Sequence, residues 1–209
     1  MDIQKLVVGN GMDGEIGHHF TEQPKVVEKQ QLLVVGNGEI GHRVTEQPKV
    51  VEKQQLLVVG NGMVGHHFIE QLVAADGLAR FTVTVLGAEP DPAYDRVHLS
   101  EVFGGKAPDA LRLADPAWYA EQGVSLRLGA KVESLDRAAR QLCLESGERL
   151  DYDRLVLATG SVPFVPPIPG HERAGCFVYR TLGDLDEIRD ACAAARTGVV
   201  IGGGLLGLE

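Results

Sequence analysis

The chain has 209 residues, 44% of them hydrophobic, with 20 Lys and Arg against 29 Asp and Glu and a formal net charge of -9. The apolar content is enough for a buried core in one or two domains, and the acidic balance without a basic cluster excludes a nucleic-acid-binding surface. The apolar run at residues 198–208 is rich in glycine and far shorter than the roughly 20 residues of a membrane helix, so we expect no membrane segment.

The cysteines indicate the redox compartment. Cys143, Cys176 and Cys192 are widely separated and show neither a C-x-x-C motif nor zinc-ligand spacing, so a disulfide framework, a redox dithiol and a metal site are not expected. The first residues lead into a strand-like run without the apolar stretch of a secretory signal. We therefore expect free thiols in a cytoplasmic protein.

The first 62 residues contain the start of one motif nearly three times. Residues 21–38 recur without a change as residues 45–62, and each copy ends in Gly-Asn-Gly. Pro24 and Pro48 interrupt the helix that would follow the first two glycine turns, so neither copy completes a β-α-β unit. We expect residues 1–55 to be duplicated copies of the first strand and glycine turn, non-native or poorly ordered; a repeat architecture is the alternative.

The third copy is followed by an uninterrupted amphipathic helix. A strand at residues 56–59 leads into Gly60-Asn61-Gly62-Met63-Val64-Gly65, and apolar residues at helical spacing then run from Val64 to Ala75. Asp76-Gly77 is expected to cap this helix, and residues 81–86 form the next strand. A G-x-G-x-x-G turn between a strand and a helix is typical of dinucleotide-binding folds, with the phosphates at the helix N-terminus.

An acidic residue follows the second strand. Glu89 lies 24 residues beyond Gly65, close to where such folds place an acid on the ribose hydroxyls. Because a carboxylate repels a 2'-phosphate, the site is expected to hold FAD or NAD and not NADP.

Short strands separated by turns are predicted between the two glycine motifs. They cover residues 124–128, 131–135, 141–144 and 155–157, and imply an antiparallel meander inserted between parallel-sheet elements. A proline-rich connector at residues 163–169 precedes a capping box formed by Thr181 and Asp184, which opens a helix to Ala195. The strand-like run Val199–Ile201 then leads into a second glycine turn, Gly202-Gly203-Gly204-Leu205-Leu206-Gly207.

This succession over residues 56–209 is similar to the pyridine nucleotide-disulfide oxidoreductase family of two-dinucleotide flavoproteins. Residues 58–66, 93–100, 157–161 and 199–209 look, within that family, like the N-terminal part of the large subunits of assimilatory NAD(P)H-dependent nitrite reductases. The resemblance implies an α/β, FAD/NAD(P)-binding Rossmann-like three-layer fold with an inserted antiparallel β-meander, truncated. It further implies an FAD domain over residues 56–170 and the start of an NAD(P)H domain over residues 171–209.

The resemblance also implies roles for individual residues. The FAD site would comprise Gly60, Asn61, Gly62 and Gly65 at the pyrophosphate, Glu89 at the ribose, Arg96 and Ser100 toward the flavin, and Ala158, Thr159 and Gly160 passing close to it. Gly202, Gly204 and Gly207 would begin the NAD(P)H site. Electrons would pass from NAD(P)H through FAD toward iron-sulfur and sirohaem centres outside these residues, and we expect the fragment to be inactive alone.

Two departures from family patterns bear on the activity. Relatives with a redox dithiol carry a C-x-x-C near the first helix, which is absent here. Ferredoxin and rubredoxin reductases often place Lys after Leu-Ser, where this chain has Glu101, and this favours nitrite reductase. The alternatives are a ferredoxin or rubredoxin reductase, an NADH oxidase, or a non-catalytic nucleotide-binding fragment that self-associates through exposed strand edges. Small-molecule nucleotides are the expected partners, and a small subunit or self-association leaves no mark in the sequence.

Overall fold

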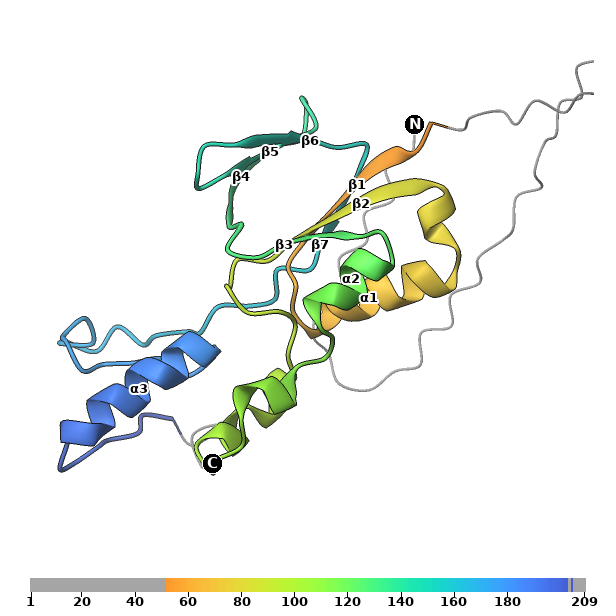
Figure 1. Cartoon of the computed structure of the whole chain (residues 1–209). Helices are drawn as coiled ribbons and strands as arrows, with labels where there is room; N and C mark the ends of the chain where they lie inside the picture. Colours follow the sequence, from red (N-terminus) through yellow and green to blue (C-terminus); the bar gives the residue numbers. More distant parts are fainter. Residues whose placement is uncertain (1–51, 203, 205–209) are drawn as a thin grey trace, which may run out of the picture. The chain divides into compact units, whose positions relative to one another are not determined.

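A computed structural model describes residues 52–202 and 204 of the chain (Figure 1). The described residues from Lys53 onward belong to one compact unit. The first two copies of the repeated motif and Gly207 lie outside the described residues, so the expectations about them stay predictions.

A four-stranded parallel sheet forms the centre of the fold. Its order is β3-β2-β1-β7, with β1 (Gln54–Val59) between β2 (Phe81–Leu86) and β7 (Arg154–Leu157), and β3 (Ser125–Arg127) at the edge beyond β2. Every pairing in this sheet is parallel. In the observed register, Leu56 of β1 lies opposite Val83 of β2 on one side and Arg154 of β7 on the other. The strand expected at residues 124–128 is therefore part of this sheet, and not of the meander.

Helices cover one face of the sheet. Alternate residues of β1 and β2, beginning with Leu56 and Val83, pack against Ile69 of α1 (Met63–Ala74) and Tyr119 of α2 (Pro116–Glu121). This is the period-two pattern of a strand facing the period-3.6 stripe of a helix. The helix ends at Ala74, and it is Asp76 that takes the left-handed conformation, with φ 56°. The cap predicted at Asp76-Gly77 is therefore formed through Asp76, while Gly77 opens the short 3-10 helix η1 (Gly77–Ala79), where a Cβ would lie 2.3 Å from Cδ1 of Leu72.

An antiparallel meander covers the opposite face. Its strands are β4 (Val132–Asp136), β5 (Gln141–Leu144) and β6 (Arg149–Asp151), paired in that order. Leu57 and Val59, the other alternate residues of β1, pack with Leu142 and Leu144 of β5. Helices, parallel sheet and meander thus form three layers (Figure 1), which confirms the α/β fold with an inserted meander; β6 is the strand that the sequence did not predict.

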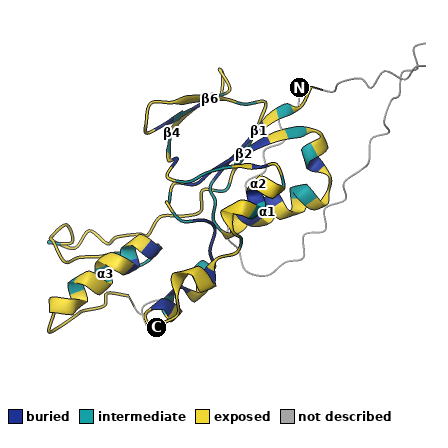
Figure 2. Ribbon diagram, viewed as in Figure 1, coloured by how far each residue is buried: buried dark blue, intermediate teal, exposed yellow. Residues whose placement is uncertain are grey.

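A third apolar cluster joins the segment after β2 to the last described helix. It contains Tyr94, Leu99 and Val102 around η2 (Arg96–Val102), Leu111 of η3 (Pro108–Leu111), and Leu182 and Leu185 of α3 (Leu182–Ala194). Thr181 caps α3 as predicted. Its hydroxyl accepts a hydrogen bond from the backbone amide of Asp184 at 3.0 Å, and the Asp184 carboxylate accepts one from the backbone amide of Thr181 at 2.7 Å. The buried residues of α3 lie at its N-terminal end, and most of the rest is exposed (Figure 2).

The strand expected at Val199–Ile201 is absent. These three residues have no regular structure and are 83%, 72% and 72% exposed. A strand needs a neighbour for its backbone groups, and no described segment pairs with this run. The apolar sequence alone therefore did not determine a strand.

Candidate dinucleotide-binding site

The first glycine turn lies where the carboxyl ends of three parallel strands meet. The amide of Gly60 donates to the carbonyl of Leu86 at the end of β2, and the amide of Ala158 donates to the carbonyl of Val59 at the end of β1. Ligands of open α/β sheets bind outside this edge. The structure thus brings the first turn and the Ala158-Thr159-Gly160 segment together.

Gly60 and Gly65 are required by packing within the protein. Gly60 has φ 109°, and a Cβ there would lie 2.2 Å from the carbonyl oxygen of Ala158. A Cβ on Gly65 would lie 2.0 Å from the carbonyl oxygen of Gly60. Both distances are far below van der Waals contact, so these two glycines allow the helix, the turn and β7 to approach one another.

Gly62 differs, because no protein atom requires a glycine there. Its φ is -88° and a Cβ would have no neighbour within 4 Å. Gly62 is also the N-cap of the twelve-residue helix α1, and no side chain caps that end. The first intrahelical bond is donated by His66 to the carbonyl of Gly62, so the amides of the preceding three residues have no acceptor within the helix. Open space beside free amide donors suits a pyrophosphate.

The side chain of Asn61 turns into the protein. Its Oδ1 accepts a hydrogen bond from the hydroxyl of Tyr119 at 2.9 Å, and that hydroxyl lies 2.8 Å from Nδ1 of His66. Because the Tyr119 proton is used for Asn61, Nδ1 of His66 is assigned as the donor to Tyr119. Nδ2 of Asn61 is buried without a hydrogen-bond partner. This polar chain ties the glycine turn to α1 and α2.

Burial shifts the proton affinities in this chain. Desolvation lowers the pKa of His66, and the nearby Glu70 carboxylate only partly opposes the effect. Desolvation likewise raises the pKa of Tyr119 to about 12. Both groups are therefore neutral near pH 7, as hydrogen-bonded groups inside a core should be.

Glu89 is held by two partners. Its Oε1 lies 2.6 Å from Nη2 of Arg96, and its Oε2 accepts the hydroxyl of Tyr94 at 2.7 Å. The structure thus joins two of the predicted site residues directly. It also changes the specificity argument, because the Arg96 guanidinium offsets the negative charge that was expected to repel a 2'-phosphate.

Arg96 also reaches the segment before α3, and so does Arg180. Nη1 of Arg96 donates to the carbonyl of Arg180 at 2.7 Å. The Arg180 guanidinium lies against Gly160, whose Cβ would be 3.3 Å from its Nη2. No ion pair of this guanidinium occurs among the described residues. Sequence reasoning had no signal for Arg180, because only the packing of α3 against η2 and η3 brings this residue to Gly160.

The remaining predicted residues are less closely connected. Ser100 lies in η2 with Arg96 but has no contact with Glu89 among the described interactions. Glu101 pairs with Lys106, so an ammonium lies beside the position where ferredoxin reductases often carry lysine. At the second turn, a Cβ on Gly202 or Gly204 would meet nothing within 4 Å. Gly203 and residues 205–209 of this second turn lie outside the described residues, so the role of its glycines stays a prediction.

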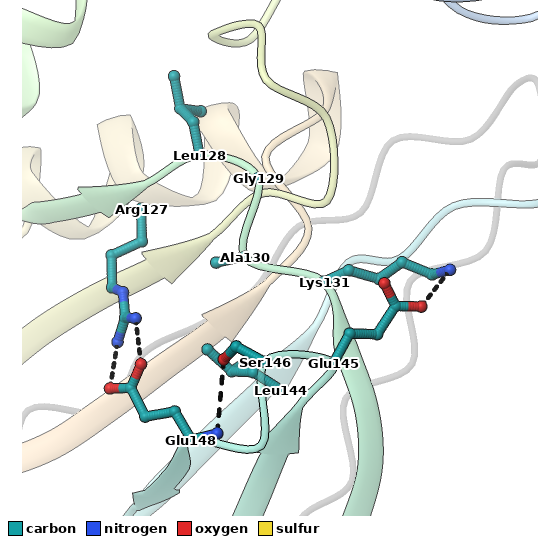
Figure 3. A pocket seen from close by; sticks show the side chains of 9 residues that line it. All are labelled: Arg127, Leu128, Gly129, Ala130, Lys131, Leu144, Glu145, Ser146 and Glu148. Atoms are coloured by element: carbon teal, nitrogen blue, oxygen red, sulfur yellow. Dashed lines mark hydrogen bonds and ion pairs between the residues drawn. The ribbon is translucent and has the colours of Figure 1, made fainter.

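A cavity of about 290 Å³ lies elsewhere, between the loop after β3 and the turn joining β5 to β6 (Figure 3). Its cationic side chains are already neutralised: Arg127 forms two hydrogen bonds to Glu148, and Lys131 pairs with Glu145. The cavity thus offers no free positive charge to a phosphate.

Two further findings concern the described part of the chain. No helix there is both long enough and apolar enough to span a bilayer. No three His, Cys, Asp or Glu side chains in residues 52–202 gather as a metal ion would need.

Comparison with known proteins identifies the class that this geometry suggests. Residues 54–209 match the family model described as pyridine nucleotide-disulphide oxidoreductase. The chain belongs to this family of oxidoreductases.

Several individual relatives are similar to this chain in sequence or in structure. The nitrite reductase [NAD(P)H] large subunit of Klebsiella oxytoca is 53% identical over 66% of this chain and 14% of that protein. The nitrite reductase (NADH) large subunit of Escherichia coli is 42% identical over 63% of this chain and 16% of that protein. Among solved structures, NADH:rubredoxin oxidoreductase from Clostridium acetobutylicum superposes with a TM-score of 0.64 at 25% identity, over 75% of this chain and 40% of that one. The matched region is thus about one-seventh of the nitrite reductase subunits.

Proposed function

We propose that this chain is the electron-entry flavoprotein module of an NAD(P)H-dependent nitrite reductase. The observation that carries the proposal is the glycine turn, in which two glycines are fixed by packing while Gly62 faces open space beside free helix amides. The similarity to nitrite reductase large subunits supports the particular activity.

In this proposal FAD lies at the first glycine turn. The amides at the start of α1 bind the pyrophosphate, and Glu89 accepts hydrogen bonds from the adenosine ribose. Gly60 and Gly65 shape the turn, while Asn61 acts through its backbone, because its side chain is directed to Tyr119. Ala158, Thr159 and Gly160 line the opposite wall, with Arg180 supplying positive charge beside Gly160.

The remaining site residues complete the electron path. Ser100 lies toward the flavin, whereas the Arg96 guanidinium, bonded to Glu89, lies at the ribose end of the same site. The second turn, with Gly202, Gly204 and Gly207, begins the NAD(P)H site. Bound flavin supplies the chemistry of accepting a hydride from NAD(P)H and releasing single electrons. The chain's own part is to bind and orient the two nucleotides, residues 56–170 serving FAD and residues 171–209 beginning the NAD(P)H domain.

The test is the visible absorbance of the purified chain after mixing with FAD and desalting. We expect flavin bands in the wild-type protein and none in Gly62→Val, whose side chain would occupy the pyrophosphate space. Because a Cβ at position 62 meets no protein atom within 4 Å, this variant should stay folded, with a loss of stability near that of replacing an N-cap glycine, about 1 kcal/mol. A colourless wild-type protein, or equal flavin content in both, contradicts the proposed site.

A turnover assay distinguishes an electron-entry module from a complete enzyme. We expect no NADH oxidase or dye-reductase turnover from the isolated chain, which matches only about one-seventh of the length of the nitrite reductase large subunits. Turnover at ordinary flavoenzyme rates would favour an NADH oxidase or ferredoxin reductase.

A further inference from the structure

We propose that Tyr94 is a positioning residue whose hydroxyl holds the Glu89 carboxylate in the orientation that accepts the ribose hydroxyls of a bound adenosine nucleotide. The inference rests on the proposed function, since it concerns the same nucleotide site. It assigns a role to Tyr94, for which the sequence predicted none.

The direction of the Tyr94 hydroxyl proton is forced by its neighbours. The hydroxyl oxygen lies 3.3 Å from the amide nitrogen of Leu182, the first residue of α3, and 2.7 Å from Oε2 of Glu89. A backbone amide can only donate and a carboxylate can only accept. The hydroxyl therefore accepts from Leu182 and donates to Glu89.

Tyr94 is a rigid support. It is 4% exposed, packs with Leu99 and Leu185, and has the Arg96 guanidinium carbon 4.9 Å from its ring centre. Burial and the hydrogen bond to Glu89 raise the pKa of Tyr94 well above its usual value. Its hydroxyl therefore stays protonated and keeps donating throughout the physiological range.

Glu89 keeps free acceptor capacity while held in this way. Each carboxylate oxygen has two lone-pair positions, and Tyr94 and Arg96 use one on each oxygen. The Glu89 side chain is 32% exposed, so the remaining positions are accessible. The amide of Gly129 fixes the residue further by donating to the Glu89 carbonyl at 2.9 Å. Because the Arg96 guanidinium offsets the negative charge of Glu89, recognition of a nucleotide by Glu89 depends on hydrogen bonds from the ribose hydroxyls. The strength of these hydrogen bonds depends on the orientation of the Glu89 carboxylate.

The test is a binding cycle on the full chain with ADP and 2',3'-dideoxy-ADP, which lacks the ribose hydroxyls. Tyr94→Phe removes one oxygen and leaves the ring. We expect it to weaken ADP binding about two- to twelvefold, the range for releasing one immobilised side chain, and to leave dideoxy-ADP binding unchanged. The ratio of the two affinities within one variant is independent of the folded fraction, so partial destabilisation does not imitate the effect.

Two further variants complete the cycle. Tyr152→Phe, at the junction of β6 and β7, removes a hydroxyl that takes part in no described hydrogen bond, and should bind both nucleotides as wild type does. In a Glu89→Gln background, Tyr94→Phe should add no further loss for ADP. Equal weakening of both nucleotides, or no weakening, overturns the role of Tyr94 and leaves the nucleotide site intact. A wild-type chain that binds neither ADP nor FAD removes the proposed function and this inference together.

Discussion

Replacing Gly65 with alanine should destabilise the fold because α1 lies directly against the glycine turn. The added Cβ would sit 2.0 Å from the carbonyl oxygen of Gly60 and 3.0 Å from its carbonyl carbon. Both atoms are backbone, so neither can rotate away, and the turn is itself fixed by its bond to Leu86. Overpacking of this kind costs up to about 3 kcal/mol, while Gly to Ala within a helix contributes about 1 kcal/mol in the other direction. We expect a net loss of about 2 kcal/mol.

Urea unfolding followed by tryptophan fluorescence measures this change well. The chain has one tryptophan, Trp118, whose ring centre lies 5.4 Å from that of His66 on α1, so its emission reports on the affected layer. A loss of about 2 kcal/mol corresponds to a fall in Tm of roughly 4–8 °C for a domain of this size. Gly62→Ala is the matched control: the same atom added three residues earlier meets nothing within 4 Å, so this variant should lose only the N-cap preference for glycine, less than about 1 kcal/mol. A Gly65→Ala midpoint equal to that of Gly62→Ala would refute the packing argument.

Two other predictions concern a helix cap and a buried imidazole. Thr181→Ala removes the hydroxyl that accepts the Asp184 amide and should cost about 1 kcal/mol, whereas Thr181→Ser should restore most of it; equal unfolding midpoints for both variants would contradict the capping role. Because burial lowers the pKa of His66 in the folded state, the unfolded chain binds the proton first, so stability should fall as the pH drops below about 6.5. The urea midpoint of His66→Gln should therefore depend less on pH over this range than that of the exposed control His67→Gln, and parallel profiles would count against the assignment.

Local signals were sufficient for much of the fold. The glycine turn, the helix after it and the strand at residues 81–86 follow from periodicity and from glycine spacing, both of which act within about 30 residues. The capping box at Thr181 and Asp184 was equally readable, since both hydrogen bonds are local. The helix and its cap form where the sequence predicts them because residues nearby in the chain satisfy their backbone groups, whereas the strand at residues 81–86 also needs β1 and β3 as partners.

The two strands that the sequence predicted wrongly or missed share one cause. Val199–Ile201 has the composition of a strand but no neighbouring strand in the described structure, and Arg149–Asp151 is a strand only because β5 pairs with it. Pairing partners are set by the whole fold, and composition cannot supply them.

The site divides in the same way. The sequence by itself determined the position of the glycine turn and the candidate Glu89, because glycine spacing and an acid after the second strand can be recognised without a structure. Arg96 was a candidate only through the family resemblance. Only the tertiary structure decided that Gly60 and Gly65 serve packing while Gly62 faces open space, and that Tyr94 and Arg96 hold Glu89. It also brought Arg180 to Gly160, 20 residues away in the chain. These relations depend on which atoms meet across elements, and that is fixed only when the layers pack.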